Sequence, residues 1–352
     1  MPRDHELTEL LRRTSRTFAL AIPMLPEPRH EEVMVAYLLF RIADTLEDAA
    51  PWSRDQRIEA LHDFVELMES GSARDAAVLG RRWREAGPSD HEGYLDLLDA
   101  TDRVVAALDR LDPEARSVVR HHTIRTCRGM AAFVSMADRK GRLRLHGLEA
   151  LRTYCYAVAG IVGEMLTELF LMEGPEVRSV EAEVRRRALF FGEALQLVNV
   201  VRDVREDGRE GRWLLDERID RETVLHLAFR DLKAAAEYTR FLQEADAPTG
   251  ILSFTALPVR LAIATLEAVR NDGPGAKIGR GRVTAIVGRT MVDLANGSPP
   301  VPATGWPGAD VPWDEDWRPV LPPPPWEAGA GPPTPEGFAA KRSVAESPIG
   351  EA

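Results

Sequence analysis

Two short acidic motifs with the same spacing are the residues in this chain best suited to chemistry. Both follow the pattern Asp-x-x-Glu-Asp, and their carboxylates are Asp44, Glu47 and Asp48 in the first motif and Asp203, Glu206 and Asp207 in the second. One such motif is weak support for a site, because acidic residues usually mark the solvated face of a helix. Here each motif follows an apolar run, VMVAYLLF or ALQLVNVV, which indicates helices largely buried on their other sides.

Further polar residues share a helical stripe with each motif. At about 100° per residue, the first stripe contains Tyr37, Arg41, Asp44 and Asp48, and the second contains Gln196, Asn199, Asp203 and Asp207. Carboxylates on buried helices need a cation. Oxygen ligands from two facing helices suit a hard cation such as Mg²⁺, whereas a di-iron centre would use Glu-x-x-His pairs, which neither motif contains. We therefore predict that the two motifs together bind Mg²⁺.

A bound Mg²⁺ indicates a phosphate-bearing substrate, because this ion commonly takes its remaining ligands from substrate phosphate and water. Arg41, Arg202 and Arg212 flank the motifs and are candidates to bind a diphosphate, the alternative being ion pairs with nearby acids. If the diphosphate lies at the mouth of an apolar bundle, the rest of the substrate is an apolar chain. The metal would then stabilise the leaving diphosphate, which is prenyl-diphosphate chemistry.

Helical periodicity continues along the chain to about residue 297 and predicts an all-α fold. The segments with this pattern are 30–48, 53–70, 93–111, 115–137, 147–172, 179–206, 221–244, 251–271 and 280–296. Ser53 and Gln56 form a predicted capping box at the start of the second segment. Alternating, strand-like runs are absent from the sequence. We therefore predict one helical domain over residues 1–297.

Residues 298–352 differ in composition and are predicted to form a separate C-terminal tail. Fourteen of the 25 prolines and four tryptophans, Trp306, Trp313, Trp317 and Trp326, lie here. Proline at this density excludes helix and favours extended chain. A flexible tail is the expected form, and attachment to the body through the tryptophans is the alternative.

Charge and cysteine content limit the class of protein. A formal net charge of −11 argues against nucleic-acid binding, which needs a basic surface. Two cysteines cannot form a disulfide framework. The N-terminus lacks the apolar segment of a signal peptide, and no run approaches the roughly 20 apolar residues that span a bilayer. We expect a cytoplasmic protein, and leave open its oligomeric state and any peripheral association with membranes.

Four separated segments resemble the squalene/phytoene synthase family in order and spacing, over about residues 10–297. They are TSRTFALAI at 14–22, YLLFRIADTLED at 37–48, YCYAVAGIVGEM at 154–165 and LQLVNVVRDVREDGREGR at 195–212. The resemblance implies a single-domain helical bundle of the isoprenoid (trans-prenyl) synthase type with a central apolar cavity. The Asp-Thr-Leu-Glu-Asp motif and the segment 254–282 are closer to the squalene branch of the family than to the phytoene branch.

The resemblance also implies that Asp44, Asp48, Asp203 and Asp207 are the Mg²⁺ ligands, and it assigns expected roles to further residues. Ser15, Arg16 and Phe18 would line the substrate entrance, while Tyr37, Gln196 and Asn199 would complete a polar rim with the arginines named above. Tyr154 is the candidate for proton transfer or cation stabilisation, with simple packing as the alternative. Phe254 would line a second reaction pocket, and Lys277 and Arg280 would bind NADPH, although plain core and a solvated loop are equally good interpretations.

The reaction implied is the head-to-head condensation of two farnesyl diphosphates to presqualene diphosphate, followed by NADPH-dependent reduction to squalene. Leu252 and the pair Tyr156-Ala157 depart from the pattern of the squalene branch, which puts the reductive step in doubt. A synthase that stops at presqualene diphosphate, dehydrosqualene or phytoene is therefore the alternative. A non-catalytic scaffold relative is a further hypothesis, but such a protein would be expected to have lost the metal carboxylates.

Overall fold

The structure is a computed structural model, which describes residues 5–15, 17–309, 312–313 and 316–327. Its first half contains α1 (His5–Thr14), α2 (Phe18–Ala21), the 3-10 helix η1 (Ile22–Met24), α3 (Arg29–Glu47), α4 (Arg54–Ser70), α5 (Ala73–Glu85), α6 (Glu92–Asp99), α7 (Thr101–Arg110) and α8 (Pro113–Ser135). The second half contains α9 (Gly147–Cys155), the π-helix η2 (Tyr156–Gly160), α10 (Ile161–Leu171), α11 (Pro175–Arg178), α12 (Glu181–Arg209), α13 (Arg221–Glu244), α14 (Thr249–Asp272) and α15 (Arg280–Ala295). The predicted all-α class is confirmed.

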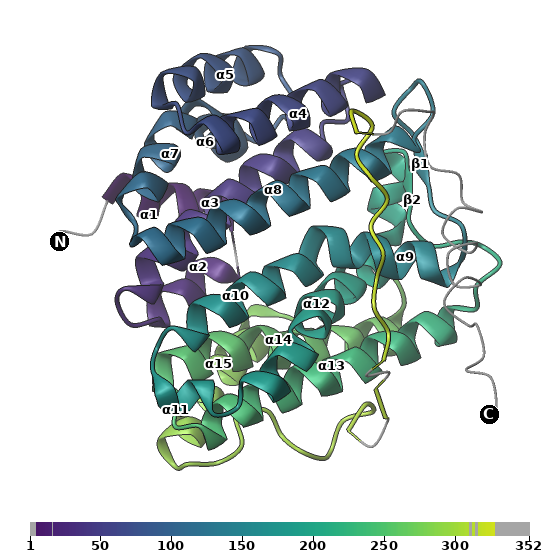
Figure 1. Cartoon of the computed structure of the whole chain (residues 1–352). Coiled ribbons are helices and arrows are strands. Elements are labelled where there is room, and N and C mark those ends of the chain that lie inside the picture. Colours follow the sequence, from purple (N-terminus) through teal and green to yellow (C-terminus); the bar gives the residue numbers. More distant parts are fainter. Residues whose placement is uncertain (1–4, 16, 310–311, 314–315, 328–352) are drawn as a thin grey trace, which may run out of the picture.

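The helices form two groups that meet along one long seam. In Figure 1 the helices up to α8 lie in the upper part of the molecule, and α10 to α15 lie below them. Helix α12 packs along α13 and also contacts α10 and α14, while α3 packs against α8. The first acidic motif ends α3 and the second ends α12. The two motifs therefore come from different groups of helices.

Local sequence signals account for several helix boundaries. The capping box is confirmed, because the Ser53 hydroxyl accepts from the Gln56 amide at 3.3 Å and the Gln56 side chain accepts from the Ser53 amide at 2.9 Å. The predicted helix 93–111 is instead two helices that break at Ala100. The predicted helix 147–172 contains the π-helical turn η2, and α1 and α5 were not predicted.

A two-residue pair of strands, β1 (Leu143–Arg144) and β2 (Arg212–Trp213), was also not predicted. The strands are parallel, and the Leu143 amide donates to the Gly211 carbonyl at 2.9 Å. Gly211 has φ +83°, a conformation that a residue with a Cβ atom rarely adopts. The pair ties the loop after α8 to the end of α12, and it fixes the backbone of Arg212.

The segment after α15 lies along the bundle as an extended chain, drawn in yellow in Figure 1. We call its described residues, 298–309, 312–313 and 316–327, the C-terminal strap. Arg260 of α14 donates to the Pro300 carbonyl at 2.5 Å where the strap begins, and Glu327 at its other end lies 3.4 Å from Arg128 of α8. These contacts correspond to the alternative in which the tail is attached to the body.

Two helical stretches are long and apolar enough to cross a membrane by length and composition, Gly147–Leu171 and Thr249–Asp272. In the first, 72% of the most apolar window is buried inside the bundle, and in the second 89% is buried. The core helices of globular domains commonly have this composition. Burial in the core therefore accounts for their apolarity.

Candidate active site

Arg212 on β2 brings the two acidic motifs together. Its guanidinium contacts Asp48 at the end of α3, and it donates to Asp207 of α12 at 2.9 Å and to Glu210 at 2.7 Å. The sequence placed Arg212 next to the second motif only. The parallel pairing of β1 with β2 explains why its side chain also reaches the first motif.

The carboxylates of the first motif have three different partners. Asp44 lies 3.3 Å from the guanidinium of Arg41, one turn earlier on α3, whereas Asp48 contacts Arg212. Glu47 points into the protein and accepts a hydrogen bond of 3.3 Å from the Tyr154 hydroxyl. Burial raises the pKa of Asp44, and it raises the pKa of Glu47 to about 7. Their environment therefore disfavours the two negative charges.

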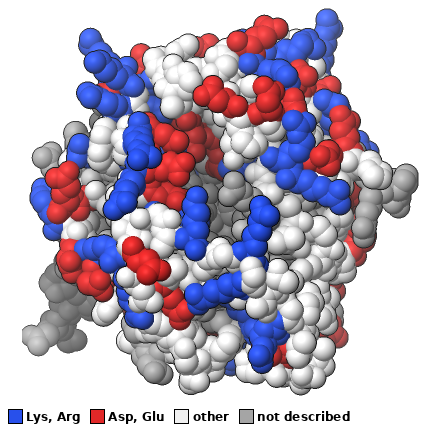
Figure 2. Space-filling view, turned by 180° about the vertical axis from the view of Figure 1, so that it is seen from behind, with Lys and Arg blue, Asp and Glu red and all other residues white. Residues whose placement is uncertain are grey.

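The end of α12 gathers the acids of the second motif. Asp203 is bonded to the neighbouring Arg202, with Nε to Oδ1 at 2.7 Å, so this arginine forms the ion pair that was the alternative to substrate binding. Burial, followed by the nearby charges of Asp203, Glu210 and Glu206, raises the pKa of Asp207 to about 7. On the face of the molecule shown in Figure 2, which lies behind the view of Figure 1, acidic side chains gather beside a hollow near the centre.

These carboxylates fit a hard cation by their chemistry. Within the described part of the chain, no three His, Cys, Asp or Glu side chains are already close enough to hold a metal. Instead the guanidinium of Arg212 links Asp48 to Asp207. A site that repels its own negative charges gains free energy from a bound cation, and oxygen ligands suit Mg²⁺. Because Arg212 contacts Asp48 and Asp207, binding of a metal ion by these two carboxylates would require Arg212 to give up part of its contacts with them.

Tyr37 and Arg41 form a polar rim beside the first motif. The Tyr37 hydroxyl donates to the Thr14 carbonyl at 2.8 Å, and Arg41 Nε donates to that hydroxyl at 3.3 Å. The Arg41 guanidinium also lies over the ring of Tyr94 on α6, 5.5 Å from its centroid. Tyr94 was not predicted, because nothing in its local sequence indicates a partner 53 positions away.

An aromatic wall continues from this rim into the apolar core. The Phe18 ring lies 5.7 Å from Tyr37 and 6.3 Å from Phe254, and Phe254 lies 6.0 Å from Phe170 by centroid distance. Ser15 accepts from the Phe18 amide, the first amide of α2, at 3.0 Å. Phe170 was not predicted. Arg16 lies outside the described residues, and the central apolar cavity stays a prediction.

Gln196 and Asn199 lie on α12 ahead of the second motif, as their spacing predicted. The Asn199 amide donates to the Gln196 side chain at 3.5 Å, and Asn199 is exposed. Lys277 and Arg280 are exposed too, in and just after the loop between α14 and α15. That loop contacts the second motif, because the Gly275 amide donates to the Arg202 carbonyl at 2.7 Å.

Arg57 of α4 is a further residue that sequence reasoning missed. It is buried, and it donates to the Glu47 carbonyl at 3.0 Å and to the Gly141 carbonyl at 2.5 Å. It therefore fixes the end of α3 against the loop that leads into β1. Its partners are backbone carbonyls, which carry no side-chain signal in the sequence, and Gly141 is 84 positions away.

Comparison with known proteins gives the family. The squalene/phytoene synthase family matches residues 11–286. Squalene synthase of Schizosaccharomyces pombe is 30% identical over 305 residues, 79% of this chain and 63% of that protein. For squalene synthase of Yarrowia lipolytica the identity is 30% over 281 residues, 74% of this chain and 60% of that protein. The chain thus spans about three fifths of the length of these relatives.

Among solved structures, TcSQS in complex with the ligand BPH1237 has the same helical fold. The TM-score is 0.66 at 23% identity, and the match covers 80% of this chain and 84% of that chain. The fold predicted from the resemblance, a helical bundle of the isoprenoid synthase type, is therefore confirmed. The predicted family is confirmed as well: this chain belongs to the squalene/phytoene synthase family.

Proposed function

We propose that this protein is a Mg²⁺-dependent synthase that condenses two farnesyl diphosphates head to head and reduces the resulting presqualene diphosphate to squalene with NADPH. The observation that carries the proposal is the meeting of the two acidic motifs at Arg212, beside the aromatic wall. The squalene synthases among the relatives support the choice of substrate. A non-reductive synthase that gives presqualene diphosphate, dehydrosqualene or phytoene is the second candidate, because of the sequence departures at Leu252 and Tyr156.

In this proposal Asp44, Asp48, Asp203 and Asp207 hold Mg²⁺. The ion would neutralise the leaving diphosphate. Arg41 lies beside Asp44, and Arg212 lies between Asp48 and Asp207; both can donate to diphosphate oxygens in the planar, paired geometry that guanidinium groups favour. Arg41 is held in place for this by Tyr37 and Tyr94.

Glu47 and Tyr154 form the buried proton-carrying pair of the proposed site. A carboxyl with a pKa of about 7 exists in both protonation states at neutral pH, whereas burial raises the pKa of Tyr154, so its hydroxyl keeps the proton. The hydrogen bond between them lets Tyr154 present its hydroxyl toward a reacting carbocation while Glu47 takes up or returns a proton. Tyr154 is also fixed by the edge of the Phe133 ring, 5.3 Å away.

The aromatic wall would hold the prenyl chains. Phe18, Phe170 and Phe254 offer ring surfaces that bury an apolar chain and keep water from the carbocation. For the reductive step, NADPH would supply a hydride. Lys277 and Arg280 suit its phosphates, because neither side chain forms an ion pair with any residue that the structure describes, and their loop contacts the second motif.

Incubation of the purified protein with farnesyl diphosphate and Mg²⁺, with and without NADPH, tests the proposal by product analysis. Squalene with NADPH and presqualene diphosphate without it are expected. Presqualene diphosphate or dehydrosqualene as the end product at saturating NADPH would establish the second candidate, and its phytoene form is tested in the same way with a C20 prenyl diphosphate as the substrate. An absence of diphosphate release under all conditions would support a scaffold relative and overturn the proposal.

The NADPH site is tested by charge reversal of Lys277→Glu and Arg280→Glu together. We expect presqualene diphosphate to accumulate although NADPH is supplied, because the aspartates lie on other helices and remain intact. Arg289→Glu, also exposed on α15, is the matched control and should make squalene normally. Normal squalene formation by the double variant would place the NADPH site elsewhere.

A further inference from the structure

Trp317 is the most deeply buried tryptophan of the C-terminal strap, with 2% of its surface exposed. The guanidinium of Arg152 lies over its ring, with Arg152 Cζ 3.6 Å from the ring centroid. Its Nε1 donates to Glu149 at 3.2 Å. Arg152 and Glu149 are both residues of α9. Trp317, a side chain of the extended, proline-rich strap, therefore binds to two side chains of α9.

The opposite side of Arg152 is bound to α12. Its guanidinium forms two bonds with Glu193, at 2.8 and 3.2 Å, and Glu193 is fully buried. A buried ion pair is favourable only when its geometry is well fixed and water is kept out. The Trp317 ring covers the face of the guanidinium and adds a cation–π contact. Helix α9 is thus clamped between α12 and the strap.

This clamp lies next to the candidate catalytic residue. Tyr154 follows Arg152 by two positions on α9, and its hydroxyl reaches Glu47 across the bundle. The π-helical turn η2 begins at Tyr156, directly after α9. Tyr156 belongs to the same small apolar cluster as Trp317, together with Phe190 of α12. The strap therefore supports the chain on both sides of Tyr154.

We propose that the C-terminal strap is a positioning element for catalysis, in which Trp317 holds α9 and η2 so that the Tyr154 hydroxyl stays on Glu47. The π-helical turn directly after α9 is a rare departure from the α-helix of the kind often found at functional sites. The catalytic part of this inference rests on the function proposed above. The clamp on α9 rests on the contacts alone.

The full-length variants Trp317→Ala and Trp306→Ala provide a matched comparison within the strap. Trp306 packs on Phe229 of α13, and its indole donates to the Pro302 carbonyl, so it makes none of the described contacts with α9. Trp317→Ala should lower kcat about tenfold with little change in KM, because small misplacements of a catalytic group have effects of this order. Trp306→Ala should leave kcat within about twofold. Trp317→Phe keeps a ring over Arg152 and should lower kcat only about threefold.

A double-mutant cycle with Tyr154→Phe separates positioning from general loss of stability. If Trp317 acts through Tyr154, then Trp317→Ala in the Tyr154→Phe background should have almost no further effect on kcat. The same tenfold loss in both backgrounds would overturn the proposal. Equal losses for Trp306→Ala and Trp317→Ala would also overturn it, because they would show that only attachment of the strap matters.

Hydrogen–deuterium exchange tests whether Trp317 holds α9 in place, without any measurement of activity. Trp317→Ala should speed exchange of the amides of α9 and η2 but not those of α4, and Trp306→Ala should leave α9 unchanged. Unchanged exchange in α9, or faster exchange with unaltered kcat, would contradict the inference. If the wild type releases no diphosphate at all, the proposed function fails, whereas the exchange result still decides whether the strap holds α9.

Discussion

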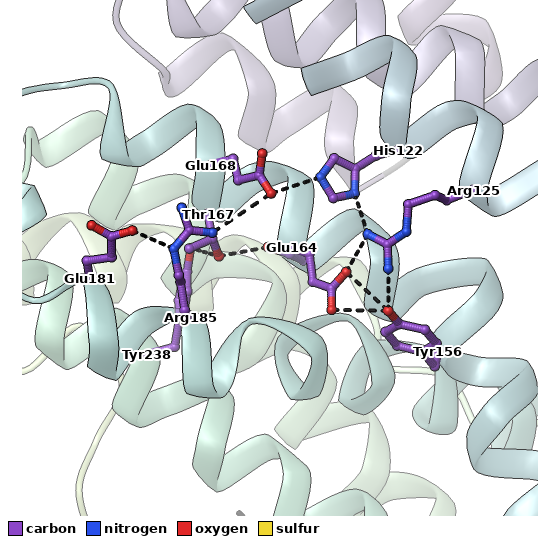
Figure 3. Close-up of polar contacts among 10 residues, drawn as sticks. His122, Arg125, Tyr156, Glu164, Thr167, Glu168, Glu181, Arg185 and Tyr238 are labelled. Atoms are coloured by element: carbon purple, nitrogen blue, oxygen red, sulfur yellow. Dashed lines mark hydrogen bonds and ion pairs between the residues drawn. The ribbon is translucent and has the colours of Figure 1, made fainter. Parts of the chain in front are cut away.

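Two polar regions between the helices of this protein are built in opposite ways. One is the acidic site described above. The other lies among the residues drawn in Figure 3, and we give the name inter-helix network to seven of them: His122, Arg125, Tyr156, Glu164, Glu168, Glu181 and Arg185. In the network each carboxylate has a partner that donates to it or is positively charged. Glu164 accepts from Arg125 at 2.7 Å and from Tyr156 at 3.1 Å, and Glu168 lies 3.2 Å from His122.

In the acidic site, by contrast, carboxylates outnumber the positively charged side chains. Arg212 contacts three acids, and Asp207 lies near three further carboxylates that raise its pKa together with burial. A satisfied network stabilises a fold, whereas a cluster of like charges is unfavourable until something binds. The comparison teaches that the surplus of charge, rather than the number of polar contacts, distinguishes the functional region.

The largest expected effect is the loss of activity in Asp207→Asn. The variant removes one ligand charge but almost no volume, so turnover should fall by about a thousandfold. The melting temperature should stay the same or rise, because a repelled buried charge is gone. Diphosphate release and thermal melting measure the two effects. Asp109→Asn, which removes a half-exposed partner of Arg120, is the control and should retain activity.

Arg212→Met should sharpen the comparison by removing the cation that holds the acids together. Without divalent metal we expect the free energy of unfolding to fall by about 2 kcal/mol or more, because Asp48, Asp207 and Glu210 are left to repel one another. Added Mg²⁺ should recover more stability in the variant than in the wild type. Melting with and without Mg²⁺ checks this. Arg218→Met, on the exposed loop after β2, should show no such difference.

A substitution in the inter-helix network should lower the stability of the protein but leave its turnover nearly unchanged. Glu168→Ala leaves the buried imidazole of His122 without this partner, and we expect the free energy of unfolding to fall by about 1–2 kcal/mol. Turnover should remain within about threefold of the wild type. Denaturant unfolding and diphosphate release are the two measurements, with the exposed Glu176→Ala as control. A large loss of turnover at full stability would place the network in the active site.

The last expected effect concerns pH. Burial, with the nearby charges of Arg125 and His121, lowers the pKa of His122 from 6.5 to about 3. The folded protein disfavours the protonated imidazole, so its contribution to stability is complete above pH 6.5 and is lost as the pH falls toward 3. His122→Gln should therefore show a shallower loss of unfolding free energy on acidification, by up to about 1.4 kcal/mol per pH unit. Parallel pH curves for both proteins would contradict this.

Local patterns in the sequence predicted those parts of the fold and site that depend on one helix at a time. The stripe from Tyr37 to Asp48 and the cap at Ser53 follow from helical spacing and from hydrogen bonds between close neighbours. The break at Ala100 could not be predicted in the same way, because the apolar pattern continues through it. Helical periodicity indicates which residues face the core, but not where tertiary packing ends a helix.

Contacts between distant segments could not be read from the sequence. Arg212 reaches Asp48, Arg41 lies over Tyr94, and Trp317 covers Arg152 only because the fold brings these segments together. The composition of the tail left two alternatives open, since proline excludes helix but does not decide whether a chain is attached. The contact of Trp317 with the buried Arg152, by contrast, joins two segments far apart in the sequence and has no signal in the composition.

The central claim, that the two acidic motifs form one site for a metal-bound diphosphate, is tested most directly by calorimetric titration of inorganic diphosphate in the presence of Mg²⁺. The wild type should bind diphosphate with Mg²⁺ and much more weakly without it. Asp48→Asn and Asp207→Asn should each abolish the Mg²⁺-dependent binding, because their carboxylates come from α3 and α12. Binding that survives in either variant, or that is independent of Mg²⁺ in the wild type, would contradict the account.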